Sequence, residues 1–310
     1  MLRLKKDMGA IVVVLLLGTT SQGQPALVHL DTAVAFKGQA VTGLTRNDFR
    51  IFDDDSEQSI VRFAGEEQPL DILLVFHASS QMVPTIKVIA DAAHNGLQEL
   101  HRGDRVAVMI FDAKSRVVLP LTQDMDAVER TLKNDVPGLV YNGHTTAAAA
   151  ATRAAEFFLA ESNNGRRRSV LHVFSVDVGV STRAEETATE KYWGAAAVYN
   201  AVIVHPFVGQ AVSTMSNLSP ALTVGLKILE GTLTGTVRET GGELFTARDA
   251  RAFRDALHRI RCRYSLWYEK PSRAPRFAPQ AMIDVELAKD TKKRYPKAKV
   301  RTRSGYLLTR

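Results

Sequence analysis

The feature that most constrains the fold of this chain is a run of consecutive apolar residues at positions 72–76, Ile-Leu-Leu-Val-Phe. A strand buried on both faces has such a continuous apolar run, whereas a strand with one solvated face alternates. Comparable segments recur at 105–111, 169–175 and 198–207, and stretches with helical spacing separate them. This alternation predicts an α/β fold with a doubly wound, mostly parallel sheet and helices on both of its faces.

The segments on either side have the alternation that is typical of antiparallel strands. Residues 24–68 and 269–310 flank the predicted α/β domain, which we place at 69–268. Each flank has about 40 residues, which is marginal for a hydrophobic core of its own. We therefore expect strands from the two flanks to pair into one small β unit beside the α/β domain.

Residues 1–23 have the pattern of a secretory signal. Arg3, Lys5 and Lys6 precede an apolar run at 10–17, and small residues follow up to a cleavage position after Gly23. The run is shorter than the roughly 20 apolar residues that a membrane crossing needs. We expect an exported protein, periplasmic or extracellular, with an uncleaved anchor as the alternative and no other transmembrane segment.

The net charge of +7 is concentrated near the C-terminal end of the sequence. Residues 270–310 contain 12 Lys and Arg against 3 Asp and Glu. Such a segment can contact an anionic surface, or its charges can lie on the solvated face of strands. Aromatic residues do not alternate with the basic ones, so no nucleic-acid partner is expected.

The sequence has no recognisable catalytic motif. Its single cysteine, Cys262, permits no internal disulfide, and the alternating segment around it predicts a small buried side chain. There is no Gly-x-Ser-x-Gly elbow, no His-Glu-x-x-His pair and no phosphate-binding glycine loop. Ser79 and His77 are two residues apart, a spacing that rarely gives nucleophile–base geometry. We therefore expect a protein that is not an enzyme.

Three short motifs occur in order along the chain. They are KGQAVTGLTRNDF at 37–49, ETGGELF at 239–245 and SGY at 304–306. Together they resemble the G-x-x-V-x-G-L-x-x-x-D-F, T-G-G-x-x-F and R-x-G-Y motifs of bacterial von Willebrand factor A-related domain proteins, which are abundant in acidobacteria. The resemblance extends from about residue 28 to residue 306. It implies an exported type A domain with flanking β segments.

The resemblance also implies a position for a divalent cation beyond the carboxyl ends of the strands. Type A domains hold the cation with an Asp-x-Ser-x-Ser loop, a Thr from a second loop and an Asp from a third, because Mg²⁺ prefers hard oxygen ligands. In this chain the corresponding positions are His77, Ser79, Gln81, Thr145 and Val176. Both carboxylates are replaced, so we expect a degenerate metal-adhesion site and no cofactor.

Three alternatives remain open at this site. A shift of one residue brings Asp177 to the third-loop position, where a divalent cation would bind weakly. His77, His144 and Asp177 together form a ligand set suited to Zn²⁺, Ni²⁺ or Cu²⁺. The two histidines can also simply form hydrogen bonds with the loop backbone.

These features predict an exported module that binds a protein or envelope partner through the loops at the carboxyl ends of the strands, without a metal. One alternative is a metal-gated adhesion or sensor module that uses the rearranged His/Asp set. The other is a structural envelope component that binds anionic surfaces through residues 270–310.

Overall fold

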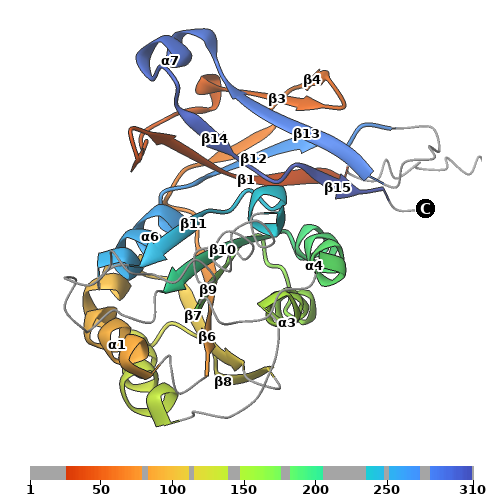
Figure 1. The fold of residues 1–310 in the computed structure, drawn as a ribbon. Coiled ribbons are helices and arrows are strands. Elements are labelled where there is room, and N and C mark those ends of the chain that lie inside the picture. Colours follow the sequence, from red (N-terminus) through yellow and green to blue (C-terminus); the bar gives the residue numbers. More distant parts are fainter. Residues whose placement is uncertain are drawn as a thin grey trace, which may run out of the picture.

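The computed structural model describes residues 26–78, 83–111, 115–138, 147–175, 182–204, 235–247, 251–272 and 280–308. They form an α/β part and an all-β part that lie against each other (Figure 1). The predicted signal at 1–23 lies outside the described residues. Among the helices of the described segments, none combines the length and the apolar character that crossing a membrane requires.

The α/β part is built on a six-stranded sheet in the order β11-β10-β9-β6-β7-β8. Its strands are β6 (Leu70–His77), β7 (Arg105–Phe111), β8 (Ser115–Thr122), β9 (Arg167–Ser175), β10 (Ala197–Val204) and β11 (Leu244–Ala247). All neighbours run parallel except β8, which is antiparallel to β7. Every residue of β6 is buried, as its apolar run predicts for a central strand. The predicted α/β fold with a mostly parallel sheet is therefore confirmed.

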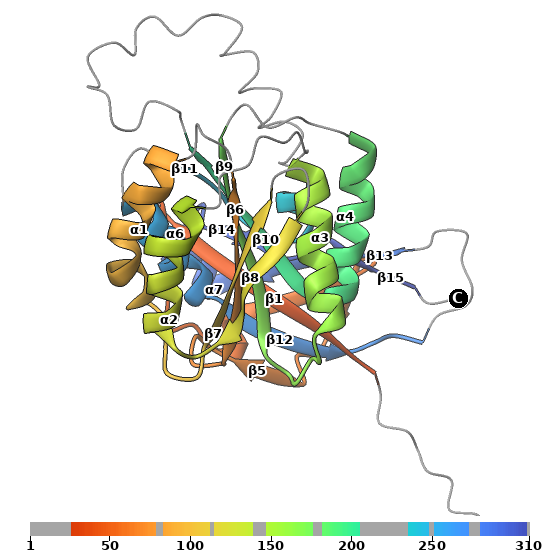
Figure 2. The same cartoon turned by 90° about the horizontal axis from the view of Figure 1, so that it is seen from below.

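Helices cover both faces of this sheet (Figure 2). On one side lie α1 (Val83–Leu97), α2 (Met125–Arg130), a π turn (Thr131–Asp135), a 3-10 turn (Val136–Gly138) and α6 (Arg251–Arg261), and on the other α3 (Ala147–Ala160) and α4 (Thr182–Ala195). A hydrophobic core lies between the helices and the sheet on each face. Alternate residues of β6 pack in the two cores, because successive side chains of a strand point to opposite faces. Leu74 and Phe76 pack with α1 and α6, whereas Leu73 and Val75 pack with α3 and α4.

The all-β part is a sandwich of two antiparallel sheets that share one apolar core. One sheet contains β1 (Leu27–Phe36), β2 (Gln39–Ala40), β5 (Arg62–Ala64), β12 (Tyr264–Glu269) and β14 (Lys299–Arg301), and the other β3 (Phe49–Asp53), β4 (Ser56–Gln58), β13 (Gln280–Leu287) and β15 (Gly305–Leu307). A 3-10 turn at Arg46–Asp48 and helix α7 (Lys289–Arg294) complete it. Strands from the two flanks pair directly, β1 with β14 and β3 with β13, so the predicted pairing of the flanks is confirmed.

Strand β12 lies in this sandwich, whereas the sequence prediction placed residues 264–268 at the end of the α/β domain. Its central residue Leu266 pairs with Leu30 of β1 on one side and with Phe63 of β5 on the other. The strand follows α6 closely and is buried along nearly its whole length. Its sequence therefore has the continuous apolar character of a strand of the parallel sheet. The domain boundaries drawn from the sequence stay predictions.

The pair Gly241-Gly242 ends the helical turn at 235–239 and lets it approach two other segments. Gly241 has φ +75°, and the N–H groups of both glycines donate back into that turn, which is the arrangement of a helix C-terminal cap. A Cβ on Gly242 would lie 1.9 Å from the carbonyl oxygen of Tyr199 in β10. A Cβ on Gly241 would lie 2.3 Å from the carbonyl carbon of Thr302. Side chains at these positions would separate the helix end from the sheet and from the sandwich.

Buried charged side chains join the two parts. Arg263, just before β12, forms an ion pair with Asp31 of β1, and neither side chain is more than 5% exposed. Nη2 of Arg263 also donates to the carbonyl oxygens of Asp31, at 2.9 Å, and of Gly241, at 2.8 Å. Burial alone would raise the pKa of Asp31, but the charges of Arg263 and Arg167 bring it below its usual value.

Candidate functional site

The six-stranded sheet has its topological switch point between β6 and β9. From β6 the chain crosses to β7 on one side, and it later returns to β9 on the other side of β6. Ligands of doubly wound sheets bind in the crevice at the carboxyl ends of the strands beside such a point. Here β6 ends at His77 and β9 ends at Ser175. We call this edge of the sheet the apex.

His77 lies at the apex as the last residue of β6. Strand alternation places its side chain on the same face as Val75, the face that α3 and α4 cover. The residue is only 6% exposed, and its ring stacks on that of Phe111 with the two centroids 5.0 Å apart. The apex therefore has a nearly buried imidazole at the end of β6 rather than a solvated carboxylate.

A second histidine, His172 of β9, lies one layer deeper in the sheet, level with Val75. It is completely buried, and its Nδ1 lies 2.7 Å from the hydroxyl of Tyr199 in β10. Its ring also contacts that of Phe111 edge-on, with 4.7 Å between the centroids. Burial, together with the nearby His77, lowers the pKa of His172 to about 3. His172 is therefore neutral at physiological pH.

Tyr192 of α4 extends this buried layer toward the helices. Its ring centroid lies 5.2 Å from that of Tyr199, and burial raises the pKa of its hydroxyl well above the usual value. Neither the Tyr192 hydroxyl nor Nε2 of His172 has a hydrogen-bond partner among the described residues. The layer beneath the apex thus consists of aromatic rings with neutral nitrogen and oxygen atoms.

His77 is the one predicted site residue that the structure describes. The other positions, Ser79, Gln81, His144, Thr145, Val176 and Asp177, lie outside the described residues. The degenerate adhesion site and its His/Asp alternative therefore stay predictions. In the part of the chain that is described, no three His, Cys, Asp or Glu side chains are grouped so as to hold a metal ion.

Cys262 lies just beyond α6 and is buried, as predicted. Its Sγ is 3.6 Å from Nε2 of His258, whose Nδ1 is 2.8 Å from a carboxylate oxygen of Glu99. The thiol, the imidazole and the carboxylate follow one another as the nucleophile, the general base and the orienting acid of a catalytic triad do. However, burial and the adjacent Glu66 raise the pKa of the thiol to about 11. The thiol is protonated at neutral pH, so the three residues do not supply an activated nucleophile.

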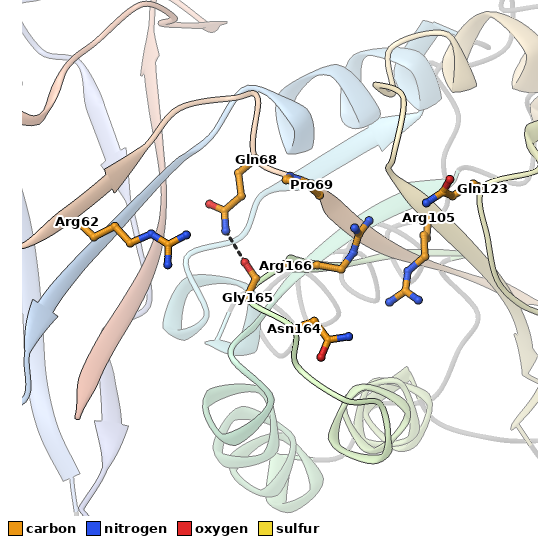
Figure 3. Close-up of a pocket in the computed structure, with 8 residues that line it drawn as sticks. All are labelled: Arg62, Gln68, Pro69, Arg105, Gln123, Asn164, Gly165 and Arg166. Carbon is orange, nitrogen blue, oxygen red and sulfur yellow. Dashed lines mark hydrogen bonds between the residues drawn. The ribbon is translucent and has the colours of Figure 1, made fainter. Parts of the chain in front are cut away.

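A pocket that was not apparent from the sequence lies at the opposite edge of the sheet (Figure 3). It has a volume of about 430 Å³, and three of the residues that line it are Arg62, Arg105 and Arg166. Arg105 begins β7 and Arg166 directly precedes β9, so both lie at the amino ends of parallel strands. We call this site the basal pocket. The run Arg166–Arg168 in front of a buried strand is the sequence signal that could have indicated it.

The other two arginines of that run have structural roles. Arg167 is fully buried and donates to the carbonyl oxygens of Arg261, at 2.9 Å, and Arg263, at 3.1 Å. Arg168 donates from Nη1 to the carbonyl oxygen of Phe158, at 2.9 Å, at the end of α3. They fix the start of β9 to the segment that joins α6 to β12 and to α3, while Arg166 alone of the three lines the pocket.

Comparison with known proteins bears on the α/β part of the chain. Residues 72–180 match the family model described as the von Willebrand factor type A domain. No curated protein matches the chain significantly.

Several solved structures are similar in fold. The conserved hypothetical protein BatB from Bacteroides thetaiotaomicron is 14% identical, with a TM-score of 0.43, over 62% of this chain and 96% of that chain. An aerotolerance-related membrane protein from Bacteroides fragilis NCTC 9343, with multiple mutations to serines, is 14% identical with a TM-score of 0.44, over 62% and 98%. The human COPII-coat protein Sec24c is 10% identical with a TM-score of 0.46, over 84% of this chain and 46% of that chain. These likenesses concern the fold alone.

Proposed function

We propose that this chain uses its von Willebrand factor type A domain, the part matched at residues 72–180, to bind a protein or envelope partner through the loops at the apex. We propose further that this binding requires no metal ion. Domains of this type are typically protein-binding modules and are usually not catalytic. The switch point between β6 and β9 supports the apex as the binding edge, since ligand crevices of doubly wound sheets form there.

The observation that carries the metal-free part of the proposal is the setting of His77. Where the type A motif has its first aspartate, this chain has an imidazole that is 6% exposed and stacked on Phe111. A hard cation such as Mg²⁺ binds through oxygen ligands, and the number of charged ligands tunes its affinity. The layer below His77, formed by His172 and Tyr199, is neutral and fully buried. This setting supports direct contact between the apex and its partner, without a bridging cation.

We also propose that the protein is exported, to the periplasm or beyond the cell, because of the signal pattern at 1–23. Membership of the acidobacterial-type family is likewise a proposal. It is supported by the tight packing of the glycines in the motif at 239–245. It is supported also by Tyr306 of the motif at 304–306, whose hydroxyl donates to Asp53 in the sandwich core, at 3.0 Å.

The alternative role for residues 270–310, contact with an anionic surface, is less well supported. Several cations of this segment form ion pairs within the protein. Lys292 pairs with Glu286 at 2.7 Å, and Arg301 pairs with Glu243 at 3.3 Å. These pairs reduce the charge that the segment can present to a surface, which favours the reading of a charged strand face.

Site-specific photocrosslinking tests the proposed function. A photoreactive amino acid is placed at position 79, which follows β6, in cells that produce the protein. The matched control carries it at position 299, an exposed residue of β14 in the sandwich. We expect crosslinked adducts from position 79 that are absent from position 299 and unchanged by EDTA. Adducts confined to position 299 would contradict binding at the apex. Apex adducts that EDTA abolishes would instead support the metal-gated alternative.

A further inference from the structure

The basal pocket lies between the two parts of the protein and receives arginine side chains from both. Arg105 and Arg166 belong to the α/β part, and Arg62 belongs to β5 of the sandwich. Figure 3 shows Arg62 and Arg105 on opposite sides of the pocket, with Arg166 between them. Most of the other residues that line it are polar, among them Gln68, Gln123 and Asn164. These walls favour a polar, negatively charged ligand over an apolar one.

The three arginines of the pocket carry more positive charge than the one carboxylate that contacts them can neutralise. Asp71 is 2% exposed and accepts hydrogen bonds from Nε and Nη2 of Arg105, at 2.9 and 2.7 Å. It also accepts one from Nε of Arg166, at 2.6 Å. One carboxylate therefore faces two guanidinium groups, and Arg62 adds a third. The exposed Glu161 also acts on Arg105 electrostatically but does not line the pocket.

The donors of the pocket are held in place by the protein itself. Asp71 accepts two hydrogen bonds from Arg105, and Nη2 of Arg166 donates to the carbonyl oxygen of Gly103 at 2.5 Å. The guanidinium of Arg62 lies over the ring of Trp267, 4.5 Å from its centroid. Donors that are fixed before a ligand arrives lose less conformational entropy when it binds.

Each guanidinium retains hydrogen-bond donors for a ligand. A guanidinium carries five N–H donors, and its planar fork matches the oxygens of phosphate, sulfate and carboxylate groups. Among the described residues, Nη1 of Arg105 and Nη1 of Arg166 have no hydrogen-bond partner, although their other nitrogens are engaged. These donors, the net charge and the polar walls together select a ligand with several anionic oxygens.

We propose that the basal pocket binds an oxyanion of the phosphate or sulfate class. The spread of the three arginines across the pocket favours a ligand with two such groups over a ligand with one. Because Arg62 and Arg166 come from different parts of the protein, such a ligand also ties the sandwich to the α/β part. This site is independent of the apex, which lies at the other edge of the sheet.

Titration calorimetry with inorganic pyrophosphate tests the proposal on the full chain. The informative variant is Arg62→Gln, because it removes a cation and leaves the pairing of Asp71 intact. The matched control is Arg254→Gln, an exposed arginine of α6 that does not line the pocket. We expect saturable binding at one site, weakened at least about tenfold by Arg62→Gln and less than about twofold by Arg254→Gln, since a tenfold change equals about 1.4 kcal/mol. Pyrophosphate should bind more tightly than phosphate or sulfate.

Two outcomes of the titration would overturn the proposal. One is the absence of saturable binding by the wild-type protein at low salt. The other is an equal loss in Arg62→Gln and Arg254→Gln, which indicates general charge attraction rather than a built site. The thermal midpoint of each variant without ligand shows that the variant is folded before its affinity is compared.

Cosedimentation with vesicles distinguishes the two sources of such a group. The vesicles contain either phosphatidylglycerol with phosphatidylcholine or phosphatidylcholine alone. If the pocket takes the phosphate of a lipid headgroup, binding to the anionic vesicles should depend on Arg62. If it takes a soluble molecule, the pyrophosphate titration alone should depend on Arg62. If Arg62→Gln binds both pyrophosphate and anionic vesicles as well as the wild type does, the proposed basal site is contradicted. That result would not bear on the apex.

Discussion

Nδ1 of His172 lies 2.7 Å from the hydroxyl of Tyr199, and both side chains are completely buried in the sheet below the apex. The contact places an imidazole and a phenol in the buried interior of the sheet, where a charged imidazole is disfavoured. The pKa of His172 in the folded protein is about 3, whereas in an unfolded chain a histidine has a pKa near 6.5.

This difference makes the stability of the protein depend on pH. Because the folded-state pKa is the lower one, protons bind preferentially to the unfolded chain. The contribution is fully present above pH 6.5 and is lost as the pH falls from there toward 3. Between pH 7 and pH 5.5, His172 should lower the free energy of unfolding by about 1 kcal/mol.

Urea denaturation of His172→Asn at these two pH values checks this expectation. The variant should be less stable than the wild type at pH 7, and the difference should shrink at pH 5.5. Burial also lowers the pKa of His29, to about 4. Because His29 is present in both proteins, the difference between the variant and the wild type reports on His172. The exposed His94 provides the control through His94→Asn. A difference between wild type and His172→Asn that does not vary with pH would contradict a neutral buried imidazole.

The reactivity of Cys262 provides a second prediction. Burial and Glu66 raise the pKa of its thiol to about 11, so almost no thiolate is present at pH 8. In the folded protein, alkylation by iodoacetamide should be slow at pH 8 and should become faster as the pH rises toward 11. Mass spectrometry follows the modification, with urea-unfolded protein as the reference for an accessible thiol. Rapid alkylation of the folded protein at pH 7 would indicate an activated cysteine and reopen a catalytic role.

A third prediction concerns the buried ion pair between Arg263 and Asp31. Asp31→Ala should leave Arg263 buried without its carboxylate, and breaking such a pair costs about 3–5 kcal/mol of stability. Glu57→Ala breaks the exposed pair with Arg50 in the same sandwich and should change stability little. Denaturant titration measures both. Similar small effects in the two variants would mean that the Asp31 pair does not hold the two parts together.

The close packing of Gly242 leads to a fourth prediction. A Cβ at this position would lie 1.9 Å from the carbonyl oxygen of Tyr199, so Gly242→Ala should destabilise the protein by about 1–3 kcal/mol or more. Among the described residues, no atom lies within 4 Å of a Cβ added to Gly138, and the φ of Gly138 is not in the left-handed region. Gly138→Ala should therefore be neutral or slightly stabilising. Thermal denaturation compares the two, and equal midpoints would contradict the packing argument.

Local patterns in the sequence predict most of the α/β part correctly. The apolar run at 72–76 lies in β6, which is buried throughout. Helix α6 has apolar residues that recur at helical spacing, as expected for the helices that alternate with the strands. Pairing of the flanks also follows from the sequence, since neither flank alone can form a core.

What the sequence does not reveal depends on contacts between distant residues. His172 is one residue within an apolar segment, and its low pKa comes from its burial and from His77, which lies far from it in the sequence. The basal pocket exists because Arg62 and Arg166, more than a hundred positions apart, reach the same space. The place of β12 depends on its partners β1 and β5. No local periodicity contains this information.

The most direct test of a metal-free apex is titration calorimetry of the purified protein with MgCl₂ and MnCl₂, combined with elemental analysis of protein that was never exposed to chelators. We predict no stoichiometric cation in the purified protein and no saturable binding of either metal. The variant His77→Asp, which restores one carboxylate, should bind more tightly than the wild type. A stoichiometric, tightly held magnesium or manganese ion that Ser79→Ala releases would contradict the metal-free apex.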